Sequence, residues 1–100
     1  MNWVWTWDGI FFGYYEGEDL WTYDGRHAGK LRQNDIFDRN GHYIGEIINE
    51  NRLITNQAKK GWRNNIFTPY ARRGEYAKFA NYAGFTMYAG HEDFPLPDKF

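Results

Sequence analysis

Large apolar residues and polar turns alternate along the first two-thirds of the chain with a period of 16 residues. The period is clearest in two sets of turn residues: an Asp-Gly or Asn-Gly pair at 8–9, 24–25 and 40–41, and a glycine at 13, 29, 45 and 61. Asp-Gly and Asn-Gly tolerate the positive φ angles that the centre of a type I′ turn requires. Because Trp, Tyr, Thr and Ile flank these pairs, each unit is predicted to form a strand, a tight turn, a second strand and a looser turn.

The apolar columns of this repeat predict a closed, mainly β fold. One column contains Val4, Leu20 and Ile36 and ends in Arg52, and the next contains Trp5, Trp21, Phe37 and Leu53. A lone hairpin is marginally stable in water, whereas four equivalent hairpins around a pseudo-fourfold axis bury their bulky side chains in the middle. Residues 1–66 are therefore predicted to be four tandem 16-residue β-hairpin repeats without an insertion, of which the last is the most divergent.

Residues 67–100 leave this period and are predicted to form a helix, a short strand and an extended tail. Positions i, i+3, i+4 and i+7 of the segment 73–83 are Tyr76, Phe79, Ala80 and Ala83, which describe one face of a helix. Gly84 suits the end of that helix, 85–88 is the predicted strand, and two prolines keep the tail extended. We expect the helix and tail to cover one mouth or flank of the hairpin ring, within a single domain of residues 1–100.

Three runs of sequence carry a family resemblance. The segments DLWTYDGRHAGK at 19–30, IFDRNGHYIGEI at 36–47 and GHEDFP at 90–95 resemble the 4-fold β-flower proteins, and the resemblance covers nearly the whole chain. It implies four petals in one compact domain. It implies no activity and supplies no catalytic residues.

Composition narrows the chemistry that the chain can carry. Trp, Tyr and Phe make up 21% of the residues, whereas serine and cysteine are both absent, which excludes serine and cysteine nucleophiles and disulfides. The lack of cysteine favours a reducing, cytoplasmic location. The first residues have neither the basic nor the apolar region of a signal peptide, so none is expected there, and no apolar run of membrane-spanning length predicts a membrane partner. The net charge of −1 gives no attraction to extended nucleic acid.

One polar cluster, His91-Glu92-Asp93, keeps acid–base chemistry open as an alternative. An imidazole beside carboxylates would suit a small hydrolase that uses His91 and Glu92. A polar turn that leads into the proline-containing tail explains the same residues without chemistry, and no spacing matches a metal motif. No catalytic residue, metal or cofactor is therefore predicted.

The fourth repeat is basic, and its cations lie beside a large ring. The candidate ligand-binding residues are Lys59, Lys60, Trp62, Arg63, Arg72 and Arg73. Cations next to aromatic rings suit a phosphate joined to a base. The favoured hypothesis is a non-catalytic binding module that sequesters an anionic, nucleotide-like small molecule, as compact phage-encoded defence inhibitors do. A solvated basic face with Trp62 buried in the core is the simpler interpretation.

Aromatic side chains on the surface provide another alternative. Side chains alternate across a strand, so Trp3, Trp7, Tyr14 and Tyr15 cannot all face the interior. Trp and Tyr are common anchors of protein interfaces. A protein-interaction or self-assembly module, including a homo-oligomer, is therefore the alternative to ligand binding.

Overall fold

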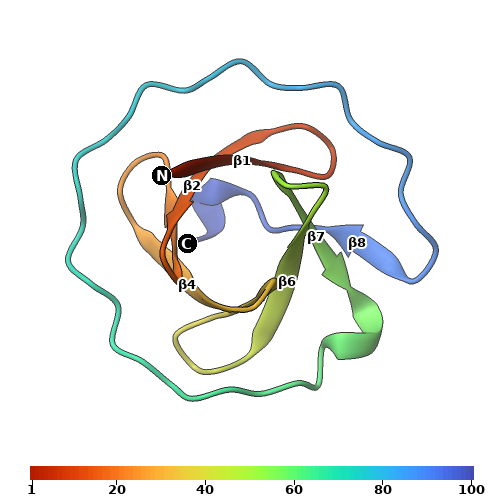
Figure 1. Cartoon of the computed structure of the whole chain (residues 1–100), viewed down its shortest axis with the longest axis horizontal. Helices are drawn as coiled ribbons and strands as arrows, with labels where there is room; N and C mark the ends of the chain where they lie inside the picture. The colour runs from red at the N-terminus through yellow and green to blue at the C-terminus, as the bar shows by residue number, and fades with distance from the viewer.

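Eight β-strands and two single turns of 3₁₀ helix form the regular structure of the computed structural model, which describes residues 1–100 (Figure 1). The strands are β1 (Asn2–Thr6), β2 (Phe11–Glu16), β3 (Asp19–Thr22), β4 (His27–Arg32), β5 (Asp35–Phe37), β6 (Tyr43–Ile48), β7 (Arg52–Asn56) and β8 (His91–Asp93), and the helical turns are η1 (Gln57–Lys59) and η2 (Pro97–Lys99). Each strand pairs with the next in the order β1 to β8, and β1 also pairs in parallel with β7. The sheet therefore closes into a ring, and the predicted mainly β fold is confirmed.

Two successive strands make one petal of this ring. Petal 1 is β1–β2, petal 2 is β3–β4, petal 3 is β5–β6 and petal 4 is β7–β8. The tight turns of the first three petals lie at the predicted Asp-Gly and Asn-Gly pairs, where Gly9, Gly25 and Gly41 have φ angles of 91°, 89° and 79°. These turns form the petal tips, which point outward in Figure 1.

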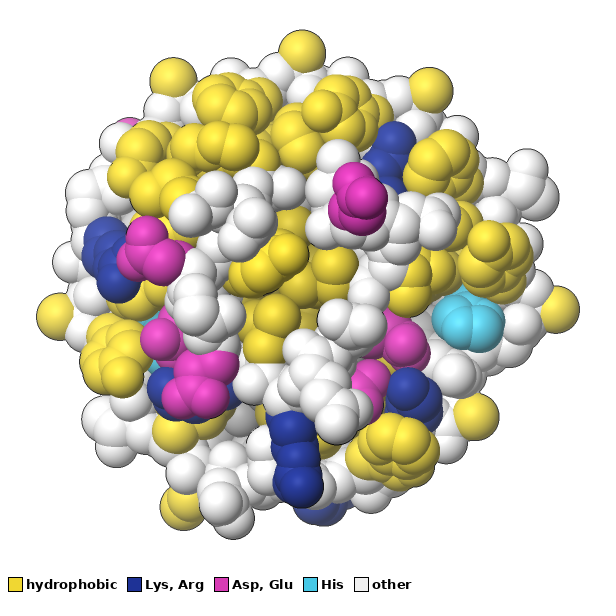
Figure 2. Space-filling model, viewed as in Figure 1, with side chains coloured by type: hydrophobic (Ala, Val, Ile, Leu, Met, Phe, Trp, Pro, Cys, Tyr) yellow, Lys and Arg dark blue, Asp and Glu magenta, His cyan; other side chains and the backbone are white.

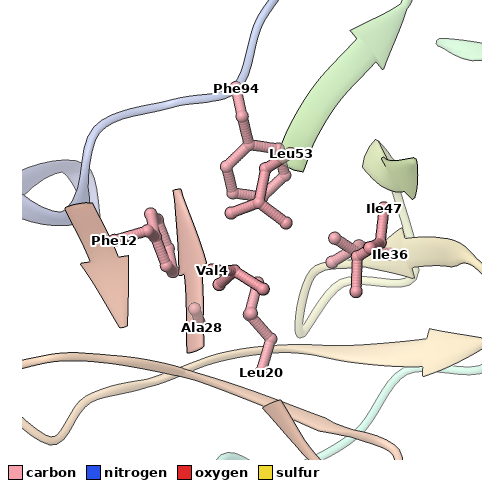
Figure 3. Close-up of a cluster of buried hydrophobic side chains, with 8 residues drawn as sticks. All are labelled: Val4, Phe12, Leu20, Ala28, Ile36, Ile47, Leu53 and Phe94. Carbon is pink, nitrogen blue, oxygen red and sulfur yellow. The ribbon is translucent and has the colours of Figure 1, made fainter. Parts of the chain in front are cut away.

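The core receives one apolar side chain from the first strand of every petal. The side chains of Val4, Leu20, Ile36 and Leu53 are fully buried and converge on the middle of the ring (Figure 3). Phe12, Ala28, Ile47 and Phe94 surround them. Burying a side chain of this size contributes about 1.5–3 kcal/mol. The 16-residue period thus places one such contribution in each quarter of the ring.

Leu53, not Arg52, holds the core position of petal 4, so the predicted uninterrupted repeat is wrong at this point. The looser turns before petals 2 and 3 contain two residues each, 17–18 and 33–34, whereas the turn before petal 4 contains three, 49–51. This one-residue insertion moves every later apolar position by one. The insertion restores an aliphatic residue to the buried column.

The second strand of petal 4 comes from the end of the chain. After η1 the chain leaves the ring, and β8 returns to pair with β7, with Ile54 opposite Asp93. The basic segment 59–63, which the repeat predicts to be part of a returning strand, is therefore not the partner of β7. Residues 1–66 supply three complete petals and only one strand of the fourth.

Residues 62–90, here called the belt, encircle the ring in an extended conformation (Figure 1). The predicted helix over 73–83 and the predicted strand over 85–88 are both wrong. Backbone N–H groups of the belt bond to carbonyl oxygens of the petal tips: Asn64 and Phe67 to Gly41 and Arg39, Arg73 and Tyr76 to Gly25 and Tyr23, and Tyr82 and Phe85 to Gly9 and Trp7. Nine belt residues thus pass each 16-residue unit, and the petals are met in reverse order.

A three-residue period in the belt sequence explains why it does not form a helix. Aromatic rings stand at 67, 70, 76, 79, 82, 85 and 88, with Arg73 at the remaining place, and Ala, Gly or Thr follows each of them. A period of three is that of an extended polyproline II-type chain, whereas an α-helix repeats every 3.6 residues. The extended belt brings its rings onto the petals: Tyr82 stacks on Trp5 at a centroid distance of 3.9 Å, and Trp5 Nε1 donates to the carbonyl oxygen of Ala80.

The tail after β8 packs over one mouth of the ring. Phe94 and Phe100 both pack edge-on against Phe12, with ring centroids 5.3 and 5.5 Å away. The Asp93 carboxylate accepts hydrogen bonds from the backbone N–H groups of Trp7 and Asp8. Figure 2 shows the face turned toward the viewer of Figure 1, where hydrophobic side chains lie at the centre and around the rim. No helix of the structure has the length and apolarity needed to cross a membrane.

Candidate ligand-binding site

Lys59 and Lys60, the first two predicted ligand residues, are paired with carboxylates of the fold. Lys59 Nζ lies 3.1 Å from Asp35 and 3.4 Å from Glu46. Burial disfavours the charge of Lys59, but the two carboxylates outweigh it and raise the Lys59 pKa above its ordinary value. Lys60 forms an ion pair with Glu92. These ammonium groups therefore hold strands and η1 together.

Trp62 and Arg63 lie where the belt begins. Trp62 is 48% exposed, so it is not part of the core, and Lys59 Nζ lies 4.7 Å from the centroid of its ring. The Arg63 guanidinium donates to the carbonyl oxygens of Lys60 and Trp62. Together with Arg32, they border a hollow of about 530 Å³.

Arg73 packs on petal 2. Its guanidinium carbon lies 3.9 Å from the centroid of Trp21, and its Nη1 lies 3.1 Å from Glu16. Arg73 occupies an aromatic place in the three-residue series of the belt, so a cation–π contact replaces ring packing at this point.

Arg72 lines the largest cavity of the structure, about 560 Å³, at the gap between petals 2 and 3. We call it the arginine cavity, and its cationic residues are Arg26, Arg39, Arg72 and Lys99. They come from the tip of petal 2, the tip of petal 3, the belt and the tail. Asp38 is the one acidic side chain in the lining, and Tyr70 and Phe100 contribute rings. Of the six predicted residues, only Arg72 lies here.

Asp24 orients two of the four cations. Its Oδ2 lies 3.1 Å from Arg26 Nη2 and 3.5 Å from Arg72 Nη2, and Arg26 Nη2 also donates to the carbonyl oxygen of Pro97. Burial alone would raise the Asp24 pKa, but hydrogen bonds from Thr22 and Arg26 and the charges of both arginines lower it below its ordinary value.

Two further cations of the arginine cavity have no acidic partner. Arg39 and Lys99 have no carboxylate within ion-pair distance, whereas Asp24 compensates Arg26 and Arg72. The cavity therefore carries positive charge that the protein itself leaves unmatched.

His27 forms a wall of the cavity and holds the Tyr70 ring. His27 Nε2 lies 2.9 Å from Asp19 Oδ1, and Nδ1 accepts a hydrogen bond from the Tyr70 N–H at 3.0 Å. Nδ1 must be unprotonated to accept, so the proton of the neutral ring is on Nε2. The rings of His27 and Tyr70 stack at 4.9 Å with an interplanar angle of 11°. With both nitrogens engaged, His27 positions Tyr70 and does not act as a free base.

The free energy of unfolding is expected to fall on acidification because of His27. Burial lowers the His27 pKa, although Asp19 opposes this, so the folded pKa lies below the unfolded value of about 6.5. The stabilisation is therefore complete above the unfolded pKa and is lost as pH falls toward the folded pKa. The pKa of Asp24 is also lowered, but the stabilisation that this provides is lost only below about pH 4, so it does not affect the change near pH 6.5.

The variant His27→Phe isolates this effect, because Phe11 occupies the equivalent position in petal 1. Urea unfolding is measured at about pH 7.5 and about pH 5.5, which lie on either side of the ordinary histidine pKa. The wild-type midpoint should fall between these two conditions by more than that of the variant. Equal decreases of the urea midpoint in the two proteins would show that His27 does not cause the loss of stability at low pH.

The neighbouring gap of the ring shows which features the fold itself requires. The gap between petals 1 and 2 is equivalent to the arginine cavity. A petal residue there has a number 16 lower than its equivalent in the arginine cavity, and a belt residue has a number 9 higher. At that gap Ile10, Tyr23 and Asn81 replace Arg26, Arg39 and Arg72, and Phe12 replaces Ala28. No cavity opens there. Three arginines therefore gather at a gap where a small side chain, Ala28, leaves space, whereas the equivalent gap of the same fold has no arginine at these positions.

The cluster His91-Glu92-Asp93 forms strand β8, so the predicted polar turn is wrong. Adjacent side chains of a strand point to opposite faces, which separates His91 from Glu92. Glu92 pairs with Lys60, Asp93 accepts from backbone amides of petal 1, and His91 Nδ1 lies 3.2 Å from the carbonyl oxygen of Ala89. The structure places no group of three or more His, Asp or Glu side chains suitably for a metal ion.

Comparison with known proteins bears on the fold. A family model described as "4-fold beta flower protein" matches residues 1–77, which include petals 1 to 3, β7 and the first half of the belt. No curated protein and no solved structure matches the chain. The function must therefore be argued from the cavity.

Proposed function

Since the chain belongs to the 4-fold beta flower family, whose description names a fold and no activity, we propose a function from the arginine cavity. The protein is a non-catalytic module that binds an anionic, ring-bearing small molecule of nucleotide type between petals 2 and 3. The observation that carries this proposal is the gathering of Arg26, Arg39 and Arg72 at this gap, where the equivalent gap has Ile10, Tyr23 and Asn81.

The charge of the cavity suits a phosphate. Guanidinium groups bind phosphate oxygens through two parallel hydrogen bonds, and charge-assisted bonds are stronger than neutral ones. Arg39 and Lys99 have no acidic partner of their own to give up. A phosphate that enters therefore gains these contacts without breaking an ion pair within the protein.

The ring and the volume of the cavity suit the rest of a nucleotide. Tyr70 is 56% exposed, and His27 supports it from within. Stacking of a base on such an aromatic side chain is worth about 1–3 kcal/mol. A volume of about 560 Å³ lies within the range of about 300–1,000 Å³ that small-molecule sites occupy.

Replacement of Arg39 by glutamine is expected to weaken nucleotide binding at least about tenfold, because a charge-assisted bond to phosphate is worth about 1.5–3 kcal/mol. The melting temperature should hardly change, because Arg39 makes no side-chain ion pair within the protein. Calorimetric titration with the mono- and diphosphates of adenosine, guanosine, cytidine and uridine measures the affinities. The matched control is Arg63→Gln, which removes an arginine from the hollow beside Trp62.

Each outcome of this experiment decides something. If Arg63→Gln loses binding and Arg39→Gln keeps it, the site is the hollow beside Trp62 and the arginine cavity is wrong. If none of the eight nucleotides binds the wild-type protein, the nucleotide-binding function itself is wrong.

A self-assembly module is the second candidate, and the belt provides the observation that favours it. The belt residues Tyr76, Phe79, Tyr82, Phe85 and Tyr88 are 39–51% exposed. Figure 2 shows hydrophobic side chains along much of the rim of this face. Light scattering after size-exclusion chromatography separates the candidates, because an assembly module must give a defined oligomer and a strict monomer excludes it.

A further inference from the structure

A second cavity, about 400 Å³ in volume, adjoins the arginine cavity where petal 3 meets petal 4. It shares the lining residues Asp38, Ile44 and Pro95 with the arginine cavity. The two cavities therefore lie side by side, with these three residues at their common border. We call the second one the acidic cavity, and its charged lining residues are Asp38, Lys60, Glu92 and Asp93.

The two cavities carry charge of opposite sign. The arginine cavity has four cationic side chains and one carboxylate. The acidic cavity has three carboxylates and one ammonium group. Asp38 is shared with the arginine cavity, the Asp93 carboxylate accepts from backbone amides of petal 1, and Glu92 is paired with the ammonium group of Lys60. A second phosphate or carboxylate is repelled there, because unit charges a few ångströms apart near a protein surface interact by several kcal/mol.

Hydrogen-bond acceptors dominate the walls of the acidic cavity. Asp38 Oδ1 accepts from the backbone N–H groups of Asn40 and His42, which fixes the carboxylate against the petal tip. The Thr55 hydroxyl donates its hydrogen to the carbonyl oxygen of Ile44, so its oxygen is left as an acceptor. Glu92 adds a half-exposed carboxylate. Walls of this kind are matched by hydroxyl or ammonium donors and not by anions.

We propose that the ligand spans both cavities, with its phosphate in the arginine cavity and a hydrogen-bond-donating, non-anionic group in the acidic cavity. The ligand class is then a nucleoside diphosphate that carries a polyhydroxylated or ammonium-bearing extension. This inference rests on the proposed nucleotide-binding function. It adds that the ligand binds in one orientation and that its extension contributes to the affinity.

Matched pairs of nucleotides test the extension by calorimetric titration of the whole protein. ADP against ADP-glucose, and UDP against UDP-glucose, add hydroxyl groups, whereas CDP against CDP-ethanolamine adds an ammonium group. At least one extended nucleotide should bind about tenfold more tightly than its parent, which corresponds to about 1.4 kcal/mol. UDP-glucuronate, which adds a carboxylate to the UDP-glucose frame, should bind about tenfold more weakly than UDP-glucose.

A charge variant tests whether the acidic cavity causes this selectivity. Glu92→Gln removes one carboxylate with little change in shape and should narrow the difference between UDP-glucose and UDP-glucuronate. The matched control is Glu18→Gln, which removes an exposed carboxylate whose partner is Lys30 and which lines neither cavity. It should leave the difference unchanged.

The failure of this inference is distinguishable from the failure of the proposed function. If ADP, UDP or CDP binds but no extended nucleotide binds more tightly, the spanning ligand is wrong and the nucleotide site stands. If UDP-glucuronate binds as tightly as UDP-glucose, the proposal of a spanning ligand is also wrong. If no parent or extended nucleotide binds, both proposals fail.

Discussion

Replacement of Ala28 by phenylalanine is expected to abolish nucleotide binding while the protein stays folded. Ala28 is 4% exposed and lines the arginine cavity, and the equivalent position of petal 1 holds the fully buried Phe12. Phe12 fills its own gap by packing on Phe94 and Phe100. A phenylalanine at position 28 should fill the arginine cavity in the same way. Affinity should drop at least about a hundredfold, or about 2.7 kcal/mol, in calorimetric titration.

Two further variants keep this prediction testable if the larger ring disturbs the fold. Ala28→Ser changes polarity without filling the cavity and should bind nearly as the wild type does. Arg72→Asn copies Asn81 of the equivalent gap and should weaken binding with only a small decrease in melting temperature, because the contacts of Arg72 with Asp24 that it removes are exposed. Undiminished binding by a folded Ala28→Phe protein would show that the ligand lies elsewhere.

Replacement of Gly25 by alanine is expected to cause a large loss of stability at a petal tip. An added Cβ would lie 2.0 Å from the backbone carbonyl oxygen of Arg73, at a φ of +89° that other residues rarely adopt. The belt would have to move away, which breaks the hydrogen bond from the Arg73 N–H to the Gly25 carbonyl. We expect a loss of about 3–4 kcal/mol from backbone strain and the displaced belt.

Gly17→Ala is the matched control for this change. Gly17 also has a positive φ, +59°, but an added Cβ meets nothing within 4 Å. Only the cost of the backbone conformation remains, about 1–2 kcal/mol. A domain of this size loses about 4–8 °C of melting temperature per kcal/mol, so thermal unfolding resolves the two variants. Equal decreases would mean that the belt contact at Gly25 contributes little.

The petals were predictable from sequence because their signals are local. An Asp-Gly or Asn-Gly pair specifies its own turn, and the flanking apolar residues specify the strands. The position of Leu53 could not be read in the same way. A one-residue insertion in the turn 49–51 is invisible when glycine columns still align, and burial of Leu53 appears only once the ring closes.

The belt was missed because two periods compete in one short segment. Tyr76, Phe79, Ala80 and Ala83 fit a helical face, but two of the four are alanines that any extended chain also accepts. The three-residue spacing of rings over 67–88 is longer and more regular, and it was the better signal. No local sequence signal indicates that this segment contacts the petals in reverse order.

The arginine cavity was missed because its cations are far apart in sequence. Lys59, Lys60 and Arg63 attract notice because they neighbour Trp62, yet carboxylates from other strands neutralise both lysines. Arg26 and Arg39 look unremarkable alone. Comparison of the repeat columns would have singled them out, since Ile10 and Tyr23 hold the same positions one unit earlier.

The most direct test of the account is a map of amide chemical shifts during titration with the nucleotide that binds best. Binding in the arginine cavity should shift the amides of 26–28 at petal 2, 38–40 at petal 3, 70–72 in the belt and 99–100 in the tail. The amides of 32–37 and 62–63, around the hollow beside Trp62, should stay in place. Shifts confined to that hollow, or no shifts at any nucleotide concentration, would contradict the assignment of the arginine cavity as the binding site.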